Sequence, residues 1–575
     1  MTTSMLLLCL VGLQVVAHAL ETGEVVTPVG KLRGLKVAAA NGEPYWSFRG
    51  IPYAVPPLGD LRFAKPVPYP YQDEVIDGTR QRASCIQDPQ FLLPNEIMSE
   101  DCLFLNIFAK EINKKSPIKK KAIFFIHGGG FFFGSTFIYN PGSFVTEQDV
   151  VFVTIQYRFG LFGFLTTEDE NAPGNYGLWD QALALKWVKN NVAAFGGDPI
   201  DITIAGESAG GSSVSFLTLS PVTKDLFTRA YSSSGVATSL FAVNNLNKEA
   251  ARAIAIFVNC LDKDETRMGK EVIQCLRSRQ LSDLASFPLI SNSRTLFHPW
   301  GDGEFLPKSP FELIKDEQYL EKIGFYKRKY LFSLNNQETT IYGTFLFLNE
   351  AIIFNDTTLS EEEKFNRWQQ YLSAVSEEVI ADRLQLDNTP PELLKKLRDW
   401  YQARNPTPYD VLQLLADANF IIPTFDLIST VARNRNTESW LLYFNHYPQF
   451  MKGDLKGLIH ALDLAYWFDL GAGKNFLLHL MAPGATGVFE EEDFRLRRIF
   501  SDTIASFIKT GNPQVAPLKE LRYGWPNFDL CNGYYLDFNP RPSIQKNLKR
   551  EVRQLWEKDL PSWAFQELAH QDIIN

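Results

Sequence analysis

A serine, Ser208, stands between two glycines in the segment 206–210 (GESAG), where a tight turn could expose a nucleophile. The β-branched apolar run 202–205 before it is typical of a buried strand, and the small and apolar residues after it favour a helix packed closely on a sheet. A serine at such a strand-to-helix turn is a nucleophile elbow, which places the next amide at a helix N-terminus. The pattern predicts nucleophilic chemistry at Ser208, and an ordinary strand–helix turn is the alternative.

Three consecutive glycines follow a second apolar strand pattern, 122–126 (AIFFI), and leave backbone N–H groups uncovered by side chains. Such amides can stabilise an oxyanion, and the expected donors are Gly129, Gly130 and Ala209. A glycine-rich loop could instead hold phosphate, but the Gly-Lys-Ser/Thr ending and the Gly-x-Gly-x-x-Gly pattern are absent. The aromatic run 131–133 (FFF) that follows suits an apolar ester better than a phosphate.

Further motifs give the chain a dense resemblance to the type-B carboxylesterase and cholinesterase family of α/β-hydrolases. In the family's order, they are 48–54 (FRGIPYA), 99–106 (SEDCLFLN), 174–181 (GNYGLWDQ), 195–199 (FGGDP) and 302–307 (DGEFLP). Bile-salt-activated-lipase-like and invertebrate carboxylesterases are the branches that the chain resembles most. The resemblance implies an α/β-hydrolase fold, with a large, mostly parallel central sheet flanked by helices and helical insertions that form an active-site gorge.

α/β-Hydrolases present an acid and then a histidine after the serine, each on a loop that follows a strand. The apolar run 330–334 (YLFSL) precedes 335–338 (NNQE), which matches the family's strand–Asn-x-x-Glu pattern. The resemblance therefore implies that Glu338 is the acid, although Thr339 replaces the glycine that usually follows. A solvated loop glutamate is the alternative.

Two candidate histidines, His446 and His460, follow the acid. His446 comes directly after the apolar run 440–444 (WLLYF), a position that the resemblance implies to be structural. His460 lies in 457–464 (GLIHALDL), which resembles the family's Gly-x-x-His-Gly/Ala-x-Asp/Glu block. The resemblance therefore implies that His460 is the general base.

These assignments define a mechanism for ester hydrolysis. His460 would take the proton of the Ser208 hydroxyl during attack, and Glu338 would hold the imidazole in the required tautomer. Water activated by His460 would then hydrolyse the acyl-enzyme. The mechanism needs no metal or other cofactor, and cysteine and histidine spacings that resemble zinc ligation are absent. Ser234 matches a serine beside the family's triad, and a buried structural serine is the alternative.

The composition agrees with a large enzyme that acts on a small-molecule ester or a lipid ester. The chain has 575 residues, of which 45% are hydrophobic, and its motifs spread along one continuous fold, so we expect residues 20–575 to form a single domain. The net charge of −9 disfavours nucleic acid or an anionic membrane as a partner. The polar, helix-like sequence at 349–407 predicts a helical subdomain over the sheet. The sequence leaves the oligomeric state open, and a homo-oligomer is one of the alternatives.

Residues 1–19 have the pattern of a secretory signal peptide. A short apolar core at 5–16 precedes a small-residue cleavage site at 17–19 (AHA), although the first residues lack Lys and Arg. The apolar core is shorter than the roughly 20 residues that span a bilayer. A lipid-anchor tail and a retention signal are not found at the C-terminus. The sequence therefore predicts a secreted protein without a membrane span, whose mature chain begins at Leu20.

The cysteines fit an oxidising compartment. The resemblance implies two disulfides, each closing a loop of about 15 residues and contributing roughly 3 kcal/mol in the chain-entropy model. They are Cys85–Cys102 and Cys260–Cys275. Cys531 is left over among apolar neighbours, so we expect a buried free thiol, with an intermolecular partner as the alternative. Asn355, in the sequon Asn-Asp-Thr, is the expected glycosylation site.

One position separates this chain from the cholinesterases, whose tryptophan on the loop ending in Met-Ser-Glu-Asp-Cys holds a quaternary ammonium group by cation–π contact. The matching residue is Leu92, which has no π face, and its neighbour Phe91 is only a partial substitute. Phe131 and Phe297 would add apolar wall if they face the gorge. The sequence predicts a secreted serine hydrolase that prefers neutral, apolar esters to choline esters. The alternative is a catalytically weak or inactive cholinesterase-like adhesion or binding protein.

Overall fold

A computed structural model gives the structure of most of the chain. It describes residues 21–112, 119–243, 247–265, 267–287, 290–291, 294–295, 297–336, 338, 358–384, 389–403, 410–448, 460–469, 489–519, 521 and 524–574. The expected signal peptide, the expected mature N-terminus at Leu20 and the expected glycosylation site Asn355 lie outside the described residues.

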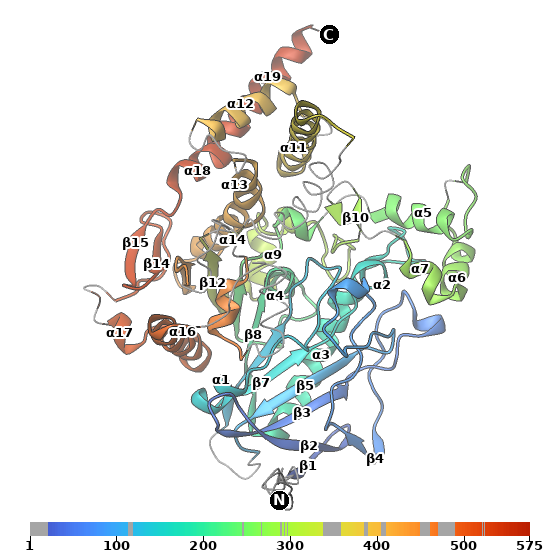
Figure 1. The fold of residues 1–575 in the computed structure, drawn as a ribbon, viewed down its shortest axis with the longest axis vertical. Helices are drawn as coiled ribbons and strands as arrows, with labels where there is room; N and C mark the ends of the chain where they lie inside the picture. The colour runs from blue at the N-terminus through green and yellow to red at the C-terminus, as the bar shows by residue number, and fades with distance from the viewer. Residues whose placement is uncertain are drawn as a thin grey trace, which may run out of the picture.

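Within the described residues, one sheet of 13 strands forms the centre of the molecule (Figure 1). In spatial order its strands are β1 (Thr22–Thr27), β2 (Gly30–Ala38), β3 (Pro44–Pro52), β5 (Phe104–Ala109), β7 (Val151–Ile155), β6 (Lys120–Ile126), β8 (Gly197–Glu207), β9 (Arg229–Ser233), β12 (Lys329–Asn335), β13 (Ser439–Phe444), β14 (Tyr534–Phe538) and β15 (Ser543–Lys546), and β4 (Gln72–Asp77) pairs with β2. Every neighbouring pair from β7 to β14 is parallel, whereas pairs at the two ends of this order are antiparallel. The expected mostly parallel α/β-hydrolase sheet is confirmed.

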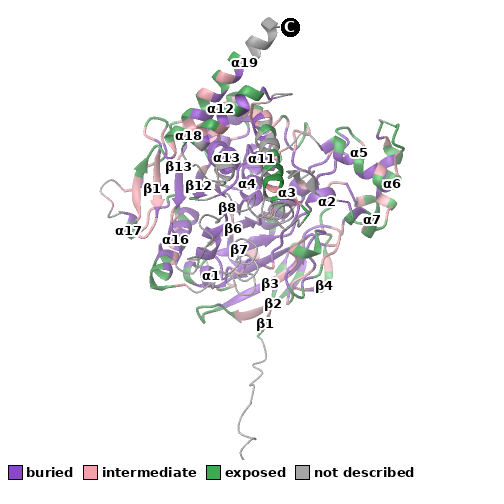
Figure 2. Cartoon of the chain, turned by 45° about the horizontal axis from the view of Figure 1, so that its top comes forward, coloured by how far each residue is buried: buried purple, intermediate pink, exposed green. Residues whose placement is uncertain are grey.

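The central strands form because their residues are apolar on both faces. All residues from Ala122 to Ile126 in β6 are fully buried, as Figure 2 shows for the middle of the sheet. Successive side chains alternate between two core clusters, with Phe124 on one face and Phe125 on the other. Strands covered on both faces read as continuous apolar runs, which is why the sequence pattern located them.

Helices cover both faces of the sheet. Helices α3 and α4 pack on β6 and β8 and share a core cluster with Phe124, whereas α1 and α16 belong to the cluster that contains Phe125. The described helices are α1 (Gly142–Gln148), α2 (Gly160–Phe164), α3 (Tyr176–Asn191), α4 (Ala209–Leu219), α5 (Asn247–Phe257), α6 (Lys270–Ser278), α7 (Leu281–Ala285), α8 (Pro310–Leu313), α9 (Glu317–Lys322), α11 (Glu361–Leu384), α12 (Pro391–Gln402), α13 (Asp410–Ala416), α14 (Ile422–Arg433), α16 (Glu491–Thr510), α17 (Ala516–Lys519), α18 (Arg550–Gln554) and α19 (Leu560–Ile574). A two-stranded ribbon joins β10 (Ile290–Ser291) to β11 (Arg294–Thr295).

A helical layer lies at the top of the molecule in Figure 1, where α11, α12 and α13 meet the C-terminal helices. Its core contains Ile380 of α11, Leu397 of α12 and Trp556 near the C-terminus. The expected helical subdomain at 349–407 therefore contains α11 and α12, while residues 349–357, 385–388 and 404–407 lie outside the described residues. The stretch Gln413–Arg433 is long and apolar enough to cross a membrane. However, 89% of its apolar 18-residue segment is buried inside the protein, as in a core helix.

Both expected disulfides are present in the structure, whereas the expectation for the remaining cysteine is wrong. The pairs are Cys85–Cys102 and Cys260–Cys275. Cys531 is exposed because Asp529 accepts its N–H in a turn before β14. This turn directs Phe528 inward, at 5% exposure, and leaves Leu530 57% exposed. The apolar neighbours that suggested burial thus face in different directions.

Candidate active site

Ser208 occupies the turn between β8 and α4, with φ 57° and ψ −124°, a backbone conformation that is strained for a residue with a side chain. Its N–H donates to the Ser233 carbonyl at 2.8 Å. The flanking glycines are required by close approach: a Cβ on Gly206 would lie 2.3 Å from the Gly210 carbonyl oxygen, and one on Gly210 would lie 2.0 Å from that of Ile126. The local sequence therefore forms the tight strand-to-helix turn that GESAG predicts.

The glycine loop after β6 lies directly against this turn. A Cβ on Gly128 would lie 3.0 Å from Ser208 Cβ, and Gly129 and Gly130 have φ of 113° and 59°, which favour glycine. Among the described residues, the amides of Gly129, Gly130 and Ala209 have no protein acceptor. The structure thus brings the three expected oxyanion donors close to the serine turn with their N–H groups available.

Glu338 and His460 are joined by a hydrogen bond, with His460 Nδ1 2.7 Å from Glu338 Oε2. The other carboxylate oxygen of Glu338 accepts from Ser234 Oγ and from the backbone N–H of Asn335, both at 2.6 Å. Glu338 follows β12 and is 1% exposed, so it is not the solvated loop glutamate that was the alternative. Three fixed hydrogen bonds therefore orient this carboxylate toward the imidazole.

The serine hydroxyl is not hydrogen-bonded to the imidazole in this structure. Ser208 Oγ is buried and has no hydrogen-bond partner among the described residues. His460 is nevertheless held next to the turn, because its Nε2 lies 3.2 Å from Oε1 of Glu207, the residue before Ser208. Hydrogen bonds between a nucleophile and its base are often loose without substrate. The structure thus brings the three residues into one buried site, with the serine hydroxyl unpaired.

Glu207 and Asp463 are site residues that the sequence analysis did not single out. Burial raises the pKa of Glu207 above its ordinary value, against the lowering effect of His460. Burial also raises the pKa of Asp463, whose carboxylate accepts from Ser233 Oγ at 2.6 Å and from Asn335 Nδ2 at 3.2 Å. Glu207 is the variable residue of GESAG and Asp463 is the acid of the His460 motif, so both motifs carried the signal.

The imidazole of His460 is surrounded by carboxyl groups. Burial alone would lower the pKa of His460, but Glu207 and Glu338 outweigh burial and raise it above the ordinary value. Because His460 Nδ1 is hydrogen-bonded to Glu338, Nε2 is the nitrogen directed toward the serine turn. The site therefore contains an oriented, basic imidazole beside an unpaired serine hydroxyl.

Two other described histidines, His446 and His127, have structural surroundings. His446 Nε2 lies 2.6 Å from Asp493 Oδ1, which also accepts from Tyr466 Oη at 2.8 Å. Asp493 belongs to the capping box that begins α16, so His446 ties β13 to this helix. His127 stacks on Tyr157 at 4.6 Å, and burial lowers its pKa to about 4, so it is neutral near pH 7.

The three residues expected to contact substrate lie in different surroundings. Phe131 and Phe297 are 0% and 1% exposed and belong to the main core cluster. Leu92 is half-buried at the end of the short turn Pro89–Phe91. Next to it, Phe91 stacks on Phe133 of the glycine loop with ring centroids 4.4 Å apart. A contact between substrate and Leu92, Phe131 or Phe297 stays a prediction.

Comparisons with known proteins agree with this geometry. The model of the carboxylesterase family matches residues 21–556. Human cocaine esterase is 32% identical, with 96% of this chain and 92% of the relative covered. Mouse carboxylesterase 1E is also 32% identical, with 95% and 96% covered, and mouse cholinesterase is 31% identical, with 95% and 88% covered.

Proposed function

The chain belongs to the carboxylesterase family and is a carboxylic ester hydrolase, and from this premise we propose that Ser208, His460 and Glu338 are its catalytic triad. The hydrogen bond between His460 Nδ1 and Glu338, buried beside the strained serine turn, is the observation that carries the proposal. A serine hydroxyl is a weak nucleophile near neutral pH and needs an adjacent base. The intact set of three side chains also opposes the alternative of an inactive binding protein.

The reaction proceeds through an acyl-enzyme. Neutral His460 takes the Ser208 proton as Oγ attacks the ester carbonyl, and Glu338 stabilises the imidazolium that forms. The imidazolium then protonates the departing alcohol, and the C–O bond of the ester breaks. His460 next removes a proton from water, which attacks the acyl carbonyl, and Ser208 leaves with the proton returned by the imidazolium.

The negative charge of each tetrahedral intermediate is stabilised by the amides of Gly129, Gly130 and Ala209. Support comes from the absence of protein acceptors for these amides in the described chain and from the contact of Gly128 with Ser208. Ala209 also begins α4, where the helix dipole favours an anion. Loss of one such donor typically costs about 3–4 kcal/mol in the transition state.

The preferred substrates are neutral, apolar esters. Leu92 occupies the position that corresponds by motif to the ammonium-binding tryptophan, and the neighbouring surface is apolar through Phe91, Phe132 and Phe133. The relatives include both carboxylesterases and a cholinesterase, so the preference rests on these residues. An apolar alcohol or acyl group gains roughly 25 cal/mol for each Å² that it buries.

We expect kcat/KM for p-nitrophenyl butyrate to exceed that for butyrylthiocholine. A cation at Leu92 lacks about 0.5–2 kcal/mol of cation–π stabilisation, which corresponds to about 2- to 30-fold. Leu92→Trp should raise kcat/KM for the choline ester selectively, and Leu92→Met is the matched control without a π face. A clear preference of the natural chain for the choline ester would contradict the proposed specificity, whereas hydrolysis of neither ester would contradict the proposed function.

In the pH profile of kcat/KM, the acid limb, where activity rises with pH, should have an apparent pKa above 6.5, the ordinary pKa of imidazole. Only neutral His460 accepts the serine proton, so activity rises with pH through its pKa, which Glu207 and Glu338 raise against the effect of burial. Glu207→Gln removes one of these carboxylates and should move the limb to lower pH. Profiles measured from pH 5 to 9 test this, and an upward shift in the variant would contradict it.

Secretion and a single-domain organisation are also part of the proposal. The signal-peptide pattern of residues 1–19 and the two disulfides support a secreted enzyme, because disulfides persist in oxidising compartments. The continuity of one sheet from β1 to β15 supports one domain over residues 20–575. N-glycosylation of Asn355 is proposed on its sequon.

A further inference from the structure

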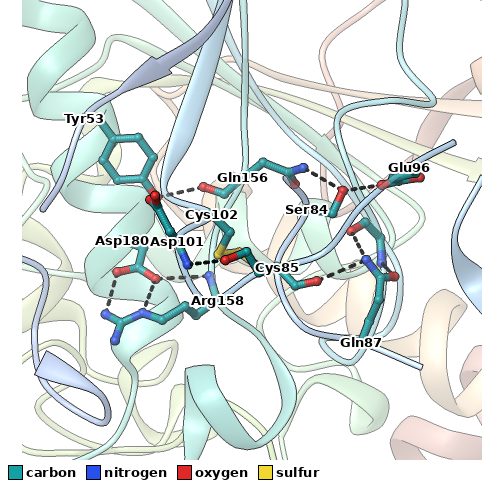
Figure 3. The surroundings of a disulfide bond; sticks show 12 residues. Tyr53, Ser84, Cys85, Gln87, Glu96, Asp101, Cys102, Gln156, Arg158 and Asp180 are labelled. Atoms are coloured by element: carbon teal, nitrogen blue, oxygen red, sulfur yellow. Dashed lines mark hydrogen bonds and ion pairs between the residues drawn. A yellow bond between two sulfur atoms is a disulfide. The ribbon is translucent and has the colours of Figure 1, made fainter. Parts of the chain in front are cut away.

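The loop closed by the Cys85–Cys102 disulfide, residues 85–102, contains a buried glutamine that binds the glycine loop. Gln87 is 4% exposed, and Figure 3 shows it beside the disulfide. Its Oε1 accepts from the Gly134 amide at 2.9 Å, and its Nε2 donates to the Gly134 carbonyl at 3.1 Å. One side-chain amide therefore satisfies both backbone groups of Gly134.

Gly134 is packed tightly against the glycines that precede it. A Cβ on Gly129 would lie 2.0 Å from the Phe133 carbonyl oxygen, and one on Gly134 would lie 2.4 Å from the Gly128 carbonyl oxygen. The peptide unit between Phe133 and Gly134 thus rests on Gly129, and its N–H is the group bound by Gln87 Oε1. A displacement of this peptide unit would displace the Gly129 backbone as well.

A second contact joins the same two loops. The ring of Phe91 stacks on Phe133, with centroids 4.4 Å apart and planes at 21°, and lies edge-on to Phe132 at 5.8 Å. A Cβ on Gly130 would lie 2.6 Å from the Phe132 ring, so this ring is packed directly on the second expected donor. The 85–102 loop therefore contacts the glycine loop at both its backbone and its side chains.

The 85–102 loop is itself fixed to the protein core. Ser84 donates to Glu96, and Gln156 Nε2 donates to Ser84 Oγ at 3.2 Å, as Figure 3 shows. The second oxygen of Glu96 accepts from the Leu93 amide at 3.0 Å. Together with the disulfide, these bonds give Gln87 a rigid support.

We propose that Gln87 is a positioning residue that fixes the amides of Gly129 and Gly130 in the geometry that stabilises the oxyanion. The inference rests on the proposed function, because it assigns these amides to the transition state. Donors must be aimed at the position where charge develops, and a small displacement weakens them in the transition state with little change in substrate binding. Loss of Gln87 should therefore lower kcat and leave KM nearly unchanged.

The test compares Gln87→Met with Gln90→Met. Methionine keeps the length of glutamine but cannot form the two hydrogen bonds to Gly134. Gln90 lies on the same loop but is exposed, and its hydrogen-bond partner among the described residues is Asp88. The test measures kcat per titrated site, that is, per active site counted by organophosphate titration, and it measures KM. It also compares the affinities for an aryl trifluoromethyl ketone and for the matching methyl ketone. The first inhibitor forms an oxyanion with the serine, and the second is a ground-state control.

For Gln87→Met we expect kcat to fall at least about tenfold and the affinity for the trifluoromethyl ketone to fall in parallel. KM and methyl ketone binding should change less than about twofold, and Gln90→Met should match the natural enzyme. Unchanged kcat per titrated site would overturn the inference, as would an equal loss of affinity for both ketones. If Gln87→Met does not fold, Gln87→Asn serves instead, because its amide is one methylene too short to form both bonds to Gly134. A smaller loss of kcat is expected in that variant, and unchanged kcat would overturn the inference. Ser208→Ala distinguishes failure of the Gln87 inference from failure of the proposed function. Ester hydrolysis retained in Ser208→Ala would contradict the proposed function itself.

Discussion

Replacing Ser208 with alanine is expected to reduce kcat/KM for a neutral ester by about 10⁴-fold or more, with little change in KM. Alanine removes the only atom that forms the acyl-enzyme. It leaves the amides of Gly129, Gly130 and Ala209 in place, and these alone sustain residual catalysis over water. Because Ser208 Oγ has no hydrogen-bond partner among the described residues, its removal leaves no buried group newly unpaired. Thermal stability should therefore be retained.

Covalent labelling identifies the nucleophile independently of rates. A fluorophosphonate should modify the natural enzyme at a single serine, found by mass spectrometry in the peptide that contains Ser208, and should not label Ser208→Ala. Ser278→Ala, at an exposed position at the end of α6, is the matched control and should be labelled normally. Modification of a different serine, or turnover retained in Ser208→Ala, would refute the assignment.

Replacing His460 with glutamine should also reduce kcat by about 10⁴-fold, whereas the same change at His446 should act on stability. Glutamine at 460 cannot take the serine proton, although its amide can still donate to Glu338. At 446 the substitution weakens a charge-assisted bond to Asp493, which also caps α16, and such bonds are worth about 1.5–3 kcal/mol. His446→Gln should therefore unfold at a lower temperature and keep its kcat per titrated site.

Calorimetric melting temperatures and kcat per titrated site, measured for both variants, separate the two roles. A loss of turnover in His446→Gln with an unchanged melting temperature would assign it a catalytic role. Full turnover in His460→Gln would remove it from the triad. A change confined to the melting temperature in both variants would contradict the proposed mechanism as a whole.

The short-range features of the site could be predicted from the sequence because adjacent residues determine them. The strained turn at Ser208 requires small neighbours at 206 and 210, and the glycine loop requires backbone that side chains would block. The apolar runs before both motifs predicted strands because parallel strands are buried on both faces. The two disulfides also followed from the resemblance to a known family, and the structure contains them.

Long-range contacts are decided by the tertiary structure. His446 and His460 each follow the acid in sequence, and each has a buried carboxylate partner in the structure. The resemblance pointed to His460, and the structure decides the contacts: Glu338 meets His460, 122 residues later in the chain, whereas His446, which follows β13, meets Asp493 of α16.

Whether a side chain faces the core or the solvent is a second feature that adjacent residues do not determine. The expected burial of Cys531 was wrong because a turn at Asp529 sends Phe528 inward and Cys531 outward. Gln87 was not singled out because an isolated amide carries no local signal of what it touches, whereas Glu207 was overlooked although it adjoins Ser208 in the GESAG motif. The sequence by itself determined which backbone turns could form and which strands are buried, since sterics and hydrophobicity act on neighbours. The packing of strands and loops decided which side chains meet, since that depends on residues far apart in the chain.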